Sequence, residues 1–384
     1  MPSTTQSAAS DYRPELRGSV IAARKNSRIQ FTRLMELVVT EFEVDPYVFD
    51  LVSLLDGTRS LPQLLHELSA SHAVTQAEVD DVLAVLSEER LLRVAASPET
   101  VPERHSRQAL FLDELVASHA FLASSAEDLQ RRLAEAHVVI VGAGGAGSWV
   151  IQSLALTGIG TFTVIDPDVV EISNLNRQVL YLPGDVGRPK ADVAVRRLYE
   201  LDSSIRVHSV KRAVVSTDDL ADLVASASLV INCADEPNVT AASDVVASVA
   251  QPLGIPHIVG GAYGANLGAP GTTIVPGRTV CWACIRAATS FDHGGDAWIP
   301  IRGRSKSSGS LAPIAGMVGN LLAWEAVRVI LQLPPALADG IREIDLMTLV
   351  WRERRLESRP DCSCAKRHPF PSASSDSGCF DRHL

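Results

Sequence analysis

A glycine-rich loop at residues 142–147 carries the clearest chemical signal in the chain. It follows the apolar run 138–141, which has the composition of a buried strand, and it opens a helical pattern. Its glycines are Gly142, Gly144, Gly145 and Gly147. Glycines let the backbone approach a phosphate closely, and a helix N-terminus favours negative charge. Asp166 ends the next predicted strand, where it can accept hydrogen bonds from ribose hydroxyls. The pattern predicts nucleotide binding, and taken alone it also fits a nicotinamide or flavin dehydrogenase.

Three charged residues beyond the loop favour a triphosphate over a dinucleotide. Arg177, Lys190 and Asp235 follow in order, the last shortly after the predicted strand 229–232. A dinucleotide carries only a pyrophosphate and does not need two further cations and a carboxylate. With ATP, Arg177 and Lys190 can neutralise the β- and γ-phosphates, while Asp235 can hold Mg²⁺ at the end of its strand. Each residue alone could be a solvated surface charge, but the ordered set predicts MgATP binding.

These residues need a scaffold that brings strand ends together. Residues 137–333 alternate strand-like runs with helical patterns, which predicts an α/β fold with a Rossmann-like, doubly wound parallel sheet. Ahead of it, residues 29–94 indicate short strands, three amphipathic helices and a last strand, typical of a winged-helix-like α+β domain. The predicted order is a disordered N-terminus (1–19), the winged-helix-like domain (20–95), a linker (96–102), the nucleotide-binding domain (103–370) and a disordered tail (371–384).

The charge of the first domain opposes the DNA-reading function that many winged helices have. Residues 28–94 contain 12 Asp and Glu against 5 Arg. The third predicted helix opens with a capping box of Thr75 and Glu78 and carries Asp80 and Asp81, where a recognition helix needs positive charge. The whole chain of 384 residues has a net charge of −10. We therefore expect no nucleic-acid partner and favour a peptide or protein ligand.

The sequence also predicts neither secretion nor a membrane span. The N-terminus lacks an apolar core, and the apolar stretch 311–333 is interrupted by Asn320, Glu325 and Arg328. Six cysteines in so long a chain, four of them in two close pairs, favour a metal site in a reducing compartment over a disulfide framework. We expect a cytoplasmic protein.

Residues 49–60, Phe-Asp-Leu-Val-Ser-Leu-Leu-Asp-Gly-Thr-Arg-Ser, precede two amphipathic helices. This segment resembles the PqqD-like domains that recognise leader peptides of ribosomally made, modified peptides. The resemblance implies that a leader segment adds as an extra strand beside the last helix, where it gains backbone hydrogen bonds. An accessory domain without a ligand is the alternative.

The chain from about residue 103 to 365 resembles the MoeB/ThiF/HesA family, bacterial relatives of ubiquitin-activating enzymes. The matching residues are Arg104, His105, Ser106, Arg107, Gln108, the glycine loop, Asp166, Asn174, Arg177, Lys190, Cys233, Ala234, Asp235 and residues 316–325. The resemblance implies ATP and Mg²⁺ bound by the loop glycines, Asp166, Asn174, Arg177, Lys190 and Asp235. A polypeptide carboxylate then attacks the α-phosphate, giving an acyl adenylate and pyrophosphate. No general base is needed, because a carboxylate is already ionised near pH 7.

In this family an early arginine crosses a homodimer interface and reaches the nucleotide of the partner. The resemblance gives that role to Arg107 and implies a homodimer. A surface arginine at the start of a helix is the alternative for this residue.

Two cysteine pairs resemble the family's structural zinc site, since four thiolates suit tetrahedral Zn²⁺. The predicted ligands are Cys281, Cys284, Cys362 and Cys364. The second pair is C-x-C where C-x-x-C is usual, so Cys379 or His368 could replace one ligand. The metal would tie the C-terminal segment to the domain.

Family members that transfer the acyl group to their own thiol often place a cysteine in the segment that corresponds to residues 287–310, which contains none here. Cys233 fits a core position better than a nucleophile. We therefore expect the adenylate to pass to an external or substrate-borne nucleophile. Residues 291–296 and 302–310 are a candidate lid, with a solvated loop as the alternative.

The pair of domains resembles the microcin-type peptide-modifying enzymes, which predicts a leader-guided peptide adenylyltransferase. Three alternatives stay open. The chain could present a precursor peptide to a separate cyclodehydratase without using ATP, it could activate a small sulfur-carrier protein, or it could be an oxidoreductase.

Overall fold

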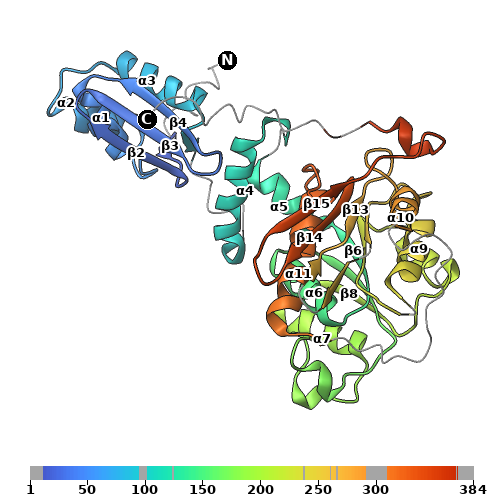
Figure 1. Cartoon of the computed structure of the whole chain (residues 1–384). Coiled ribbons are helices and arrows are strands. Elements are labelled where there is room, and N and C mark those ends of the chain that lie inside the picture. The colour runs from blue at the N-terminus through green and yellow to red at the C-terminus, as the bar shows by residue number, and fades with distance from the viewer. Residues whose placement is uncertain are drawn as a thin grey trace, which may run out of the picture. The chain divides into compact units, whose positions relative to one another are not determined.

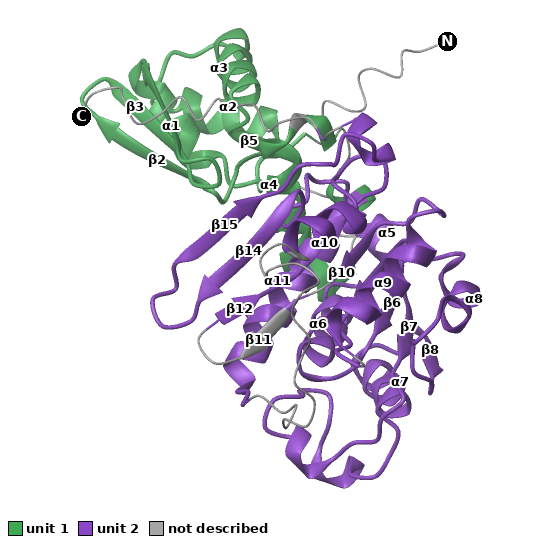
Figure 2. Cartoon of the chain, turned by 45° about the vertical axis from the view of Figure 1, so that its right-hand side comes forward, with its two compact units in different colours: residues 1–128, 376–384 green, residues 129–375 purple. Residues whose placement is uncertain are grey.

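The computed structural model describes residues 12–94, 102–122, 125–236, 238–259, 261–264, 267–290, 309–368 and 370. The chain divides into two compact units, residues 1–128 with 376–384 and residues 129–375 (Figures 1 and 2). Helix α5 (Ala126–Glu135) spans the division. Several segments with predictions lie outside the described residues. They are residues 1–11 and the tail 371–384, both predicted to be disordered, most of the linker, and nearly all of the candidate lid.

Unit 1 has the order of elements predicted for a winged-helix-like domain. An antiparallel sheet runs in the order β2 (Val20–Lys25), β3 (Arg28–Arg33), β4 (Val38–Glu43). Helices α1 (Pro46–Leu54), α2 (Leu61–Ser69) and α3 (Gln76–Glu88) follow. The core between them buries Phe31, Leu51, Leu64 and Val79. The capping box of α3 is present, with the Thr75 N–H donating to the Glu78 carboxylate at 2.8 Å.

The folded part of unit 1 differs from the prediction at both ends. Strand β1 (Pro14–Leu16) pairs antiparallel with β5 (Leu92–Val94), so residues 14–16 are a strand where the sequence predicted disorder. Three residues are too few to show a period of their own, and only the partner strand identifies them. Helix α4 (Ser106–Ser118) also belongs to unit 1, so the division falls after residue 128 and not at the predicted linker.

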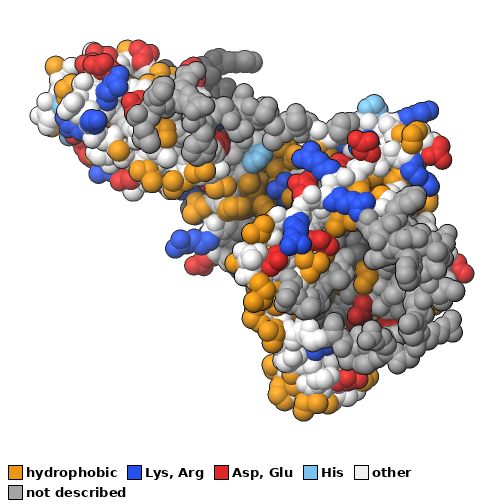
Figure 3. Space-filling view, viewed as in Figure 1, with side chains coloured by type: hydrophobic (Ala, Val, Ile, Leu, Met, Phe, Trp, Pro, Cys, Tyr) orange, Lys and Arg blue, Asp and Glu red, His pale blue; other side chains and the backbone are white. Residues whose placement is uncertain are grey.

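The surface of unit 1 has a mixed charge. Glu78, Asp80 and Asp81 are all exposed on α3. In the view of Figure 3, acidic and basic side chains lie interspersed over this unit. A mixed surface with an acidic third helix does not favour the phosphate backbone of a nucleic acid.

Unit 2 is built on the predicted doubly wound sheet. Its strand order is β13 (Thr272–Ile274), β10 (His257–Val259), β9 (Leu229–Asn232), β6 (His137–Val141), β7 (Thr161–Ile165), β8 (Arg206–Val210). All neighbours are parallel except β13, which pairs antiparallel with β10 at one edge. The chain builds β6, β7 and β8 in one direction and then returns to place β9 on the other side of β6. The ends of β6 and β9 therefore form the topological switch point, where open α/β sheets bind their ligands.

Two helices pack closely beside the sheet. Helix α6 (Gly145–Leu156) contacts α11 (Ala312–Ile330) along its length. A Cβ added at Gly319 would lie 2.6 Å from the Trp149 Cβ and 2.7 Å from the Ala146 oxygen, so the helices meet where only glycine fits. Within the described ranges, helix α11 is the segment that is long and apolar enough to cross a membrane, and half of its apolar stretch is buried. Its Glu325 is buried and accepts hydrogen bonds from the Ala336 and Leu337 N–H groups, as in a core helix.

A second sheet in unit 2 was not predicted. It is antiparallel, in the order β11 (Ala262–Gly264), β12 (Leu267–Ala269), β14 (Gly340–Asp345), β15 (Trp351–Arg355). The turn between β14 and β15 exposes Met347, Leu349 and Val350. Unit 2 also contains helices α7 (Lys190–Leu201), α9 (Val239–Ala250) and α10 (Trp282–Ser290).

Candidate active site

The glycine loop lies at the switch point, against the segment that follows β9. Gly142 has a φ of +93°, and a Cβ there would lie 2.7 Å from the Ala234 nitrogen. A Cβ at Gly147 would lie 2.0 Å from the Gly142 oxygen. These two glycines therefore let the loop pack on itself and on the end of β9. Only one atom, the Gln178 Nε2 at 3.9 Å, would lie within 4 Å of a Cβ at Gly144. Gly144 thus faces open space at the start of α6, where a phosphate can approach the helix N-terminus that Gly145 begins.

Asp166 holds the glycine loop in place. Its Oδ2 accepts from the Ala143 N–H at 2.7 Å, and its Oδ1 accepts from the Asp168 N–H at 2.9 Å. The carboxylate is 3% exposed, and burial raises its pKa, an effect that the charge of Lys190 opposes. Each carboxylate oxygen can accept a further bond, so the predicted contact with ribose hydroxyls stays compatible with this geometry.

Lys190 is brought to the same strand end as Asp166. It is the first residue of α7, its side chain is 7% exposed, and its Nζ lies 2.8 Å from the Asp168 Oδ2. Asp168 is exposed and so keeps the ammonium group close to solvent. The sequence pattern does not identify Asp168, although this residue stands two positions after Asp166 in the same loop. The structure therefore unites three of the expected parts: the glycine loop, Asp166 and Lys190.

The loop with Asn174 and Arg177 is held by its own side chains. The Asn174 Oδ1 accepts from the Glu171 N–H at 3.0 Å, and the Asn174 residue is buried. The Arg177 Nη1 donates to the Ser173 oxygen at 2.8 Å and to Asn176 at 3.0 Å. Within the described residues, the Arg177 guanidinium pairs with no carboxylate. The structure does not bring this guanidinium against Lys190 or Asp235, so a role at the phosphates requires it to leave these local acceptors.

Asp235 ends the segment that contacts Gly142. It is exposed and directly follows Ala234, at the carboxyl end of β9. Within the described part of the chain its carboxylate has no hydrogen-bond partner. An exposed carboxylate beside the glycine loop suits a Mg²⁺ ion that accompanies a nucleotide. Its neighbour Cys233 is no candidate nucleophile, because burial raises its pKa to about 12, in agreement with the expected core role.

Two further side chains shape the loop and were not assigned from the sequence. The Tyr181 hydroxyl donates to the Ala143 oxygen at 2.8 Å, and burial raises the pKa of Tyr181. Gln178 is 4% exposed, and its Oε1 has no hydrogen-bond partner in the described residues. This buried amide lies beside Gly144. Unpaired buried polar atoms are uncommon, so the unused acceptor marks Gln178 as a candidate site residue. The only sequence signal for Gln178 was its place directly after Arg177.

Arg107 lies outside unit 2. It is the second residue of α4 in unit 1, and its side chain is exposed. Within the described residues its guanidinium forms no ion pair, so it is accessible at the start of the helix. Its predicted action on the nucleotide of a partner subunit stays a prediction.

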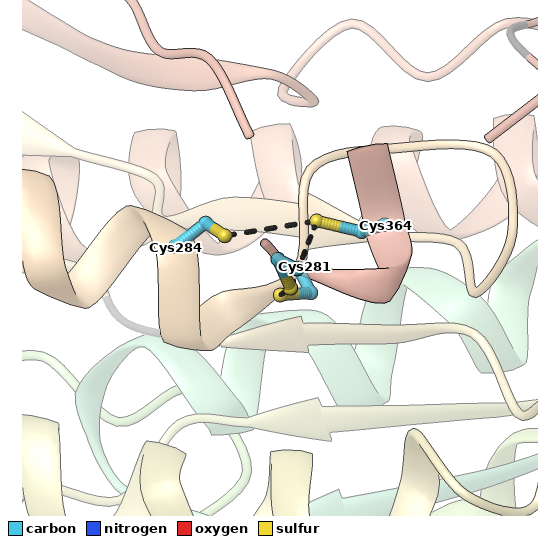
Figure 4. Close-up of side chains that lie close together, drawn as sticks. Cys281, Cys284 and Cys364 are labelled. Atoms are coloured by element: carbon cyan, nitrogen blue, oxygen red, sulfur yellow. Dashed lines mark hydrogen bonds between the residues drawn. The ribbon is translucent and has the colours of Figure 1, made fainter. Parts of the chain in front are cut away.

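The four predicted zinc ligands come together in unit 2. Their sulfur atoms all lie within 4.8 Å of one another, with Sγ–Sγ distances of 3.6 Å for Cys281–Cys362 and 3.7 Å for Cys284–Cys364. Figure 4 shows the thiols of Cys281 and Cys284, at the start of α10, facing Cys364 from a short 3₁₀ helix (Ser363–Lys366). A tetrahedral ion with Zn–S bonds of about 2.3 Å holds its sulfurs about 3.8 Å apart. The cluster therefore fits zinc, and the short C-x-C spacing is no obstacle because Cys362 caps the 3₁₀ helix that carries Cys364.

The cluster is also supported from outside its four thiols. The Arg359 N–H donates to the Cys284 Sγ at 3.4 Å. The Cys364 N–H lowers the pKa of Cys362 to about 6, whereas burial raises the pKa values of Cys281 and Cys284. Donors to sulfur favour the thiolate form that binds metal. His368 is not part of the cluster, and Cys379 lies outside the described residues.

A doubly wound sheet with a phosphate-binding loop and an accessible carboxylate at its switch point defines a nucleotide-binding enzyme domain. The sequence profile of the ThiF family matches residues 116–365, and the chain belongs to that family. The chain is 33% identical over 235 residues to the SAMP-activating enzyme E1 of Haloferax volcanii, covering 61% of this chain and 81% of the relative. It is 30% identical over 269 residues to the sulfur carrier protein ThiS adenylyltransferase of Escherichia coli, covering 69% and 97%.

The chain is thus an ATP-dependent adenylyltransferase of the ThiF/MoeB type. Its fold is also similar to a crystal structure of E. coli MccB with SeMet MccA. That comparison has a TM-score of 0.69 and 22% identity, and it covers 92% of this chain and 99% of that chain. The predicted family and fold are confirmed, and an oxidoreductase is no longer a competing interpretation.

Proposed function

We propose that the chain adenylates a carboxylate of a ribosomally made precursor peptide, which it holds through the peptide's leader. The domain formed by residues 14–94 carries this proposal. The ThiF profile begins only at residue 116, and the two sequence relatives align with 61% and 69% of the chain. The match to the structure of MccB with SeMet MccA covers 92% of the chain and therefore extends into this domain.

The sheet of unit 1 has a suitable edge for a peptide strand. Strand β4 pairs only with β3 in the described residues, so its other edge is open. An extended peptide can add to such an edge through backbone hydrogen bonds, and pockets beside it select side chains. The helix that the resemblance places beside the leader is α3, which exposes Glu78 and Asp81. These carboxylates favour a leader with basic residues.

In the proposed reaction the peptide carboxylate attacks the α-phosphorus of ATP, a new O–P bond forms, and pyrophosphate leaves. The open space at Gly144 and the N-terminus of α6 receive phosphate oxygens. Lys190 neutralises negative charge on the phosphates, and Asp235 would hold Mg²⁺, which would offset charge on the departing pyrophosphate. Arg177 also neutralises phosphate charge once its guanidinium leaves the Ser173 carbonyl. No side chain has to remove a proton, because the attacking group is already a carboxylate.

Two structural features complete the proposal. A homodimer lets Arg107 of one subunit reach the nucleotide of the other, with Arg107 as a further catalytic residue. Zn²⁺ at Cys281, Cys284, Cys362 and Cys364 ties the C-terminal segment to α10.

The decisive experiment is pyrophosphate–ATP exchange with Mg²⁺. It is run with synthetic peptides whose sequences are encoded by short reading frames beside the gene and, in parallel, with small carrier proteins. We expect exchange that depends on a peptide. Asp235→Ala and Lys190→Ala should each abolish it while leaving peptide binding intact. Glu357→Ala, an exposed carboxylate outside the site, serves as the matched control and should keep full activity.

The same experiment distinguishes the alternatives. Exchange with a carrier protein and with no peptide would identify a sulfur-carrier activating enzyme, which the 30% identity to the ThiS adenylyltransferase supports. Peptide binding without any exchange would identify a module that presents the peptide to a separate cyclodehydratase.

A further inference from the structure

Helix α4 is fastened to the N-terminal domain by paired polar contacts inside unit 1. The Arg17 Nη1 donates to the Asp113 Oδ2 at 2.6 Å. Two residues later in the domain, the Ser19 hydroxyl donates to the Glu114 Oε2 at 2.7 Å. Arg17 directly follows β1, and its own N–H donates to the Leu91 oxygen at 2.9 Å. The anchor therefore rests on the β1–β5 ladder that closes the domain.

A third contact joins the end of α3 to the same helix. The Arg90 Nη1 donates to the Ala117 oxygen in the last turn of α4 at 3.0 Å. The preceding residue, Glu89, accepts from the Arg33 Nη1 of β3 at 3.3 Å. One continuous series of contacts therefore runs from the sheet of the domain, through the end of α3, to α4. We name the three contacts Arg17–Asp113, Ser19–Glu114 and Arg90–Ala117 the α4 clamp.

The α4 clamp is shielded from water around Arg17, whereas the Asp113 side chain is 32% exposed and Arg90 is exposed. The side chains of Arg17 and Glu114 are 12% and 15% exposed. The cavity between the domain and α4 measures about 10 Å³, which is at most the space of one water molecule. Ion pairs in such a setting contribute more than exposed ones, and the loss of one partner leaves a charge unpaired. The α4 clamp can therefore fix the helix relative to the domain.

The helix that the clamp holds is the one that carries Arg107. Glu114 follows Arg107 by seven residues, close to two turns, so both side chains lie on the same face of α4. Arg107 stands about 10 Å along the helix axis from Glu114, at about 1.5 Å per residue. Because a helix of this length moves as a rod, a rotation or shift at the clamp is transmitted to the arginine.

We propose that the α4 clamp is a positioning device that couples peptide binding on the N-terminal domain to the placement of Arg107. This inference rests on the proposed function. A leader strand added along β4 and α3 orders the elements that carry Arg33, Glu89 and Arg90. The clamp passes this ordering to α4, so that a bound leader raises the fraction of molecules with Arg107 in its active position. Arg17, Asp113, Ser19, Glu114 and Arg90 are positioning residues in this scheme.

The test measures how far a leader stimulates the reaction. Pyrophosphate–ATP exchange is recorded for the full chain with a synthetic precursor peptide and with a shortened form that keeps only its C-terminal part. The ratio of the two saturating rates is the leader stimulation. Arg17→Met should lower this ratio about fivefold or more, while leader affinity, measured by fluorescence anisotropy, stays within about twofold of the wild type. The conservative variant Arg17→Lys should keep most of the ratio, because it retains a cation beside both Asp113 and Glu114.

Arg212→Met is the matched control, since it breaks an exposed Arg–Asp pair in unit 2 and should leave the ratio unchanged. Hydrogen exchange of the α4 amides gives a second measurement without any peptide: Arg17→Met should speed exchange in residues 106–118, and Arg17→Lys should leave it near the wild-type rate. A ratio that Arg17→Met does not lower, or that Arg17→Lys lowers as much as Arg17→Met, overturns the inference. A wild-type chain without any peptide-dependent exchange contradicts the proposed function itself.

Discussion

The glycines of the loop have different structural roles, and substitutions of Gly142 and Gly144 should therefore affect stability and ATP binding differently. Gly142→Ala should unfold unit 2 readily, since the new Cβ meets the Ala234 nitrogen at 2.7 Å and the backbone has a positive φ. We expect a loss of about 2 kcal/mol or more in the free energy of unfolding. Gly144→Ala places its Cβ in open space, so it should cost less stability and instead weaken ATP binding about tenfold. Urea denaturation and calorimetric ATP titration distinguish the two, and equal effects of both variants on both quantities would contradict the assignment.

His257 gives unit 2 a predictable sensitivity to acid. It is fully buried on β10, its Nε2 has no partner in the described residues, and burial lowers its pKa from 6.5 to about 4. Between these two values the unfolded chain binds a proton that the folded chain excludes, so stability falls as the pH drops below the unfolded pKa and the loss is complete below the folded pKa. This group alone should cost about 2 kcal/mol between about pH 7.5 and about pH 5.

Urea midpoints at the two pH values measure that loss. His257→Leu removes the titrating group, so its midpoint should change less with pH than that of the wild type. A wild-type midpoint that does not fall in acid would refute the buried, neutral state of His257.

At the residue scale, the sequence identifies what a local pattern can encode. The glycine loop, Asp166 and Asp235 could be found because each stands where a predicted strand ends, and parallel strands end at one edge of a sheet. The interactions of Asp168 and Tyr181 could not be found, because they depend on which side chains the fold brings against Lys190 and the Ala143 carbonyl. The pattern identifies Arg177 as a candidate phosphate-binding residue. Its hydrogen-bond acceptors in the structure, Ser173 and Asn176, could not be predicted from the pattern.

At the scale of elements, length decides what can be predicted. The strands β6, β7 and β9 are apolar and buried on both faces, so their composition identifies them. Strands β11 and β12 have three residues each, and β12 finds its partner β14 more than seventy residues later. Such non-local pairing leaves no short-range signal, which is why the second sheet and β1 were missed.

The cysteine cluster ties two elements that are distant in sequence, α10 and the 3₁₀ helix Ser363–Lys366. Cys364→Ser should release zinc measured by atomic absorption and loosen the C-terminal segment, which limited proteolysis after residue 356 would detect. We expect a loss of several kcal/mol in stability, because the free energy of metal binding is part of the free energy of folding. Cys379→Ser is the control and should keep one zinc per chain. Full zinc content in Cys364→Ser would show that another residue completes the site.

At the scale of the whole molecule, the chain joins a nucleotide-binding unit to a unit that carries both the proposed leader site and Arg107. The ThiF profile begins only at residue 116, after the domain at residues 14–94, and the two sequence relatives align with 61% and 69% of the chain. Because Arg107 and the α4 clamp lie in the same unit, the proposed coupling connects the N-terminal domain to the placement of Arg107. In the proposed scheme the leader therefore activates the chemistry and also anchors the substrate.

The role of Arg107 across a homodimer can be tested by mixing two inactive variants. Arg107→Ala subunits keep Lys190, and Lys190→Ala subunits keep Arg107. If Arg107 acts on the partner's nucleotide, a mixed dimer contains one complete site, built from Lys190 of one subunit and Arg107 of the other. Equal mixing after exchange of subunits should then restore roughly a quarter of wild-type turnover, because half of the dimers are mixed and each has one of two sites. If Arg107 acts within its own subunit, mixed dimers contain no complete site and pyrophosphate exchange stays at the level of the separate variants.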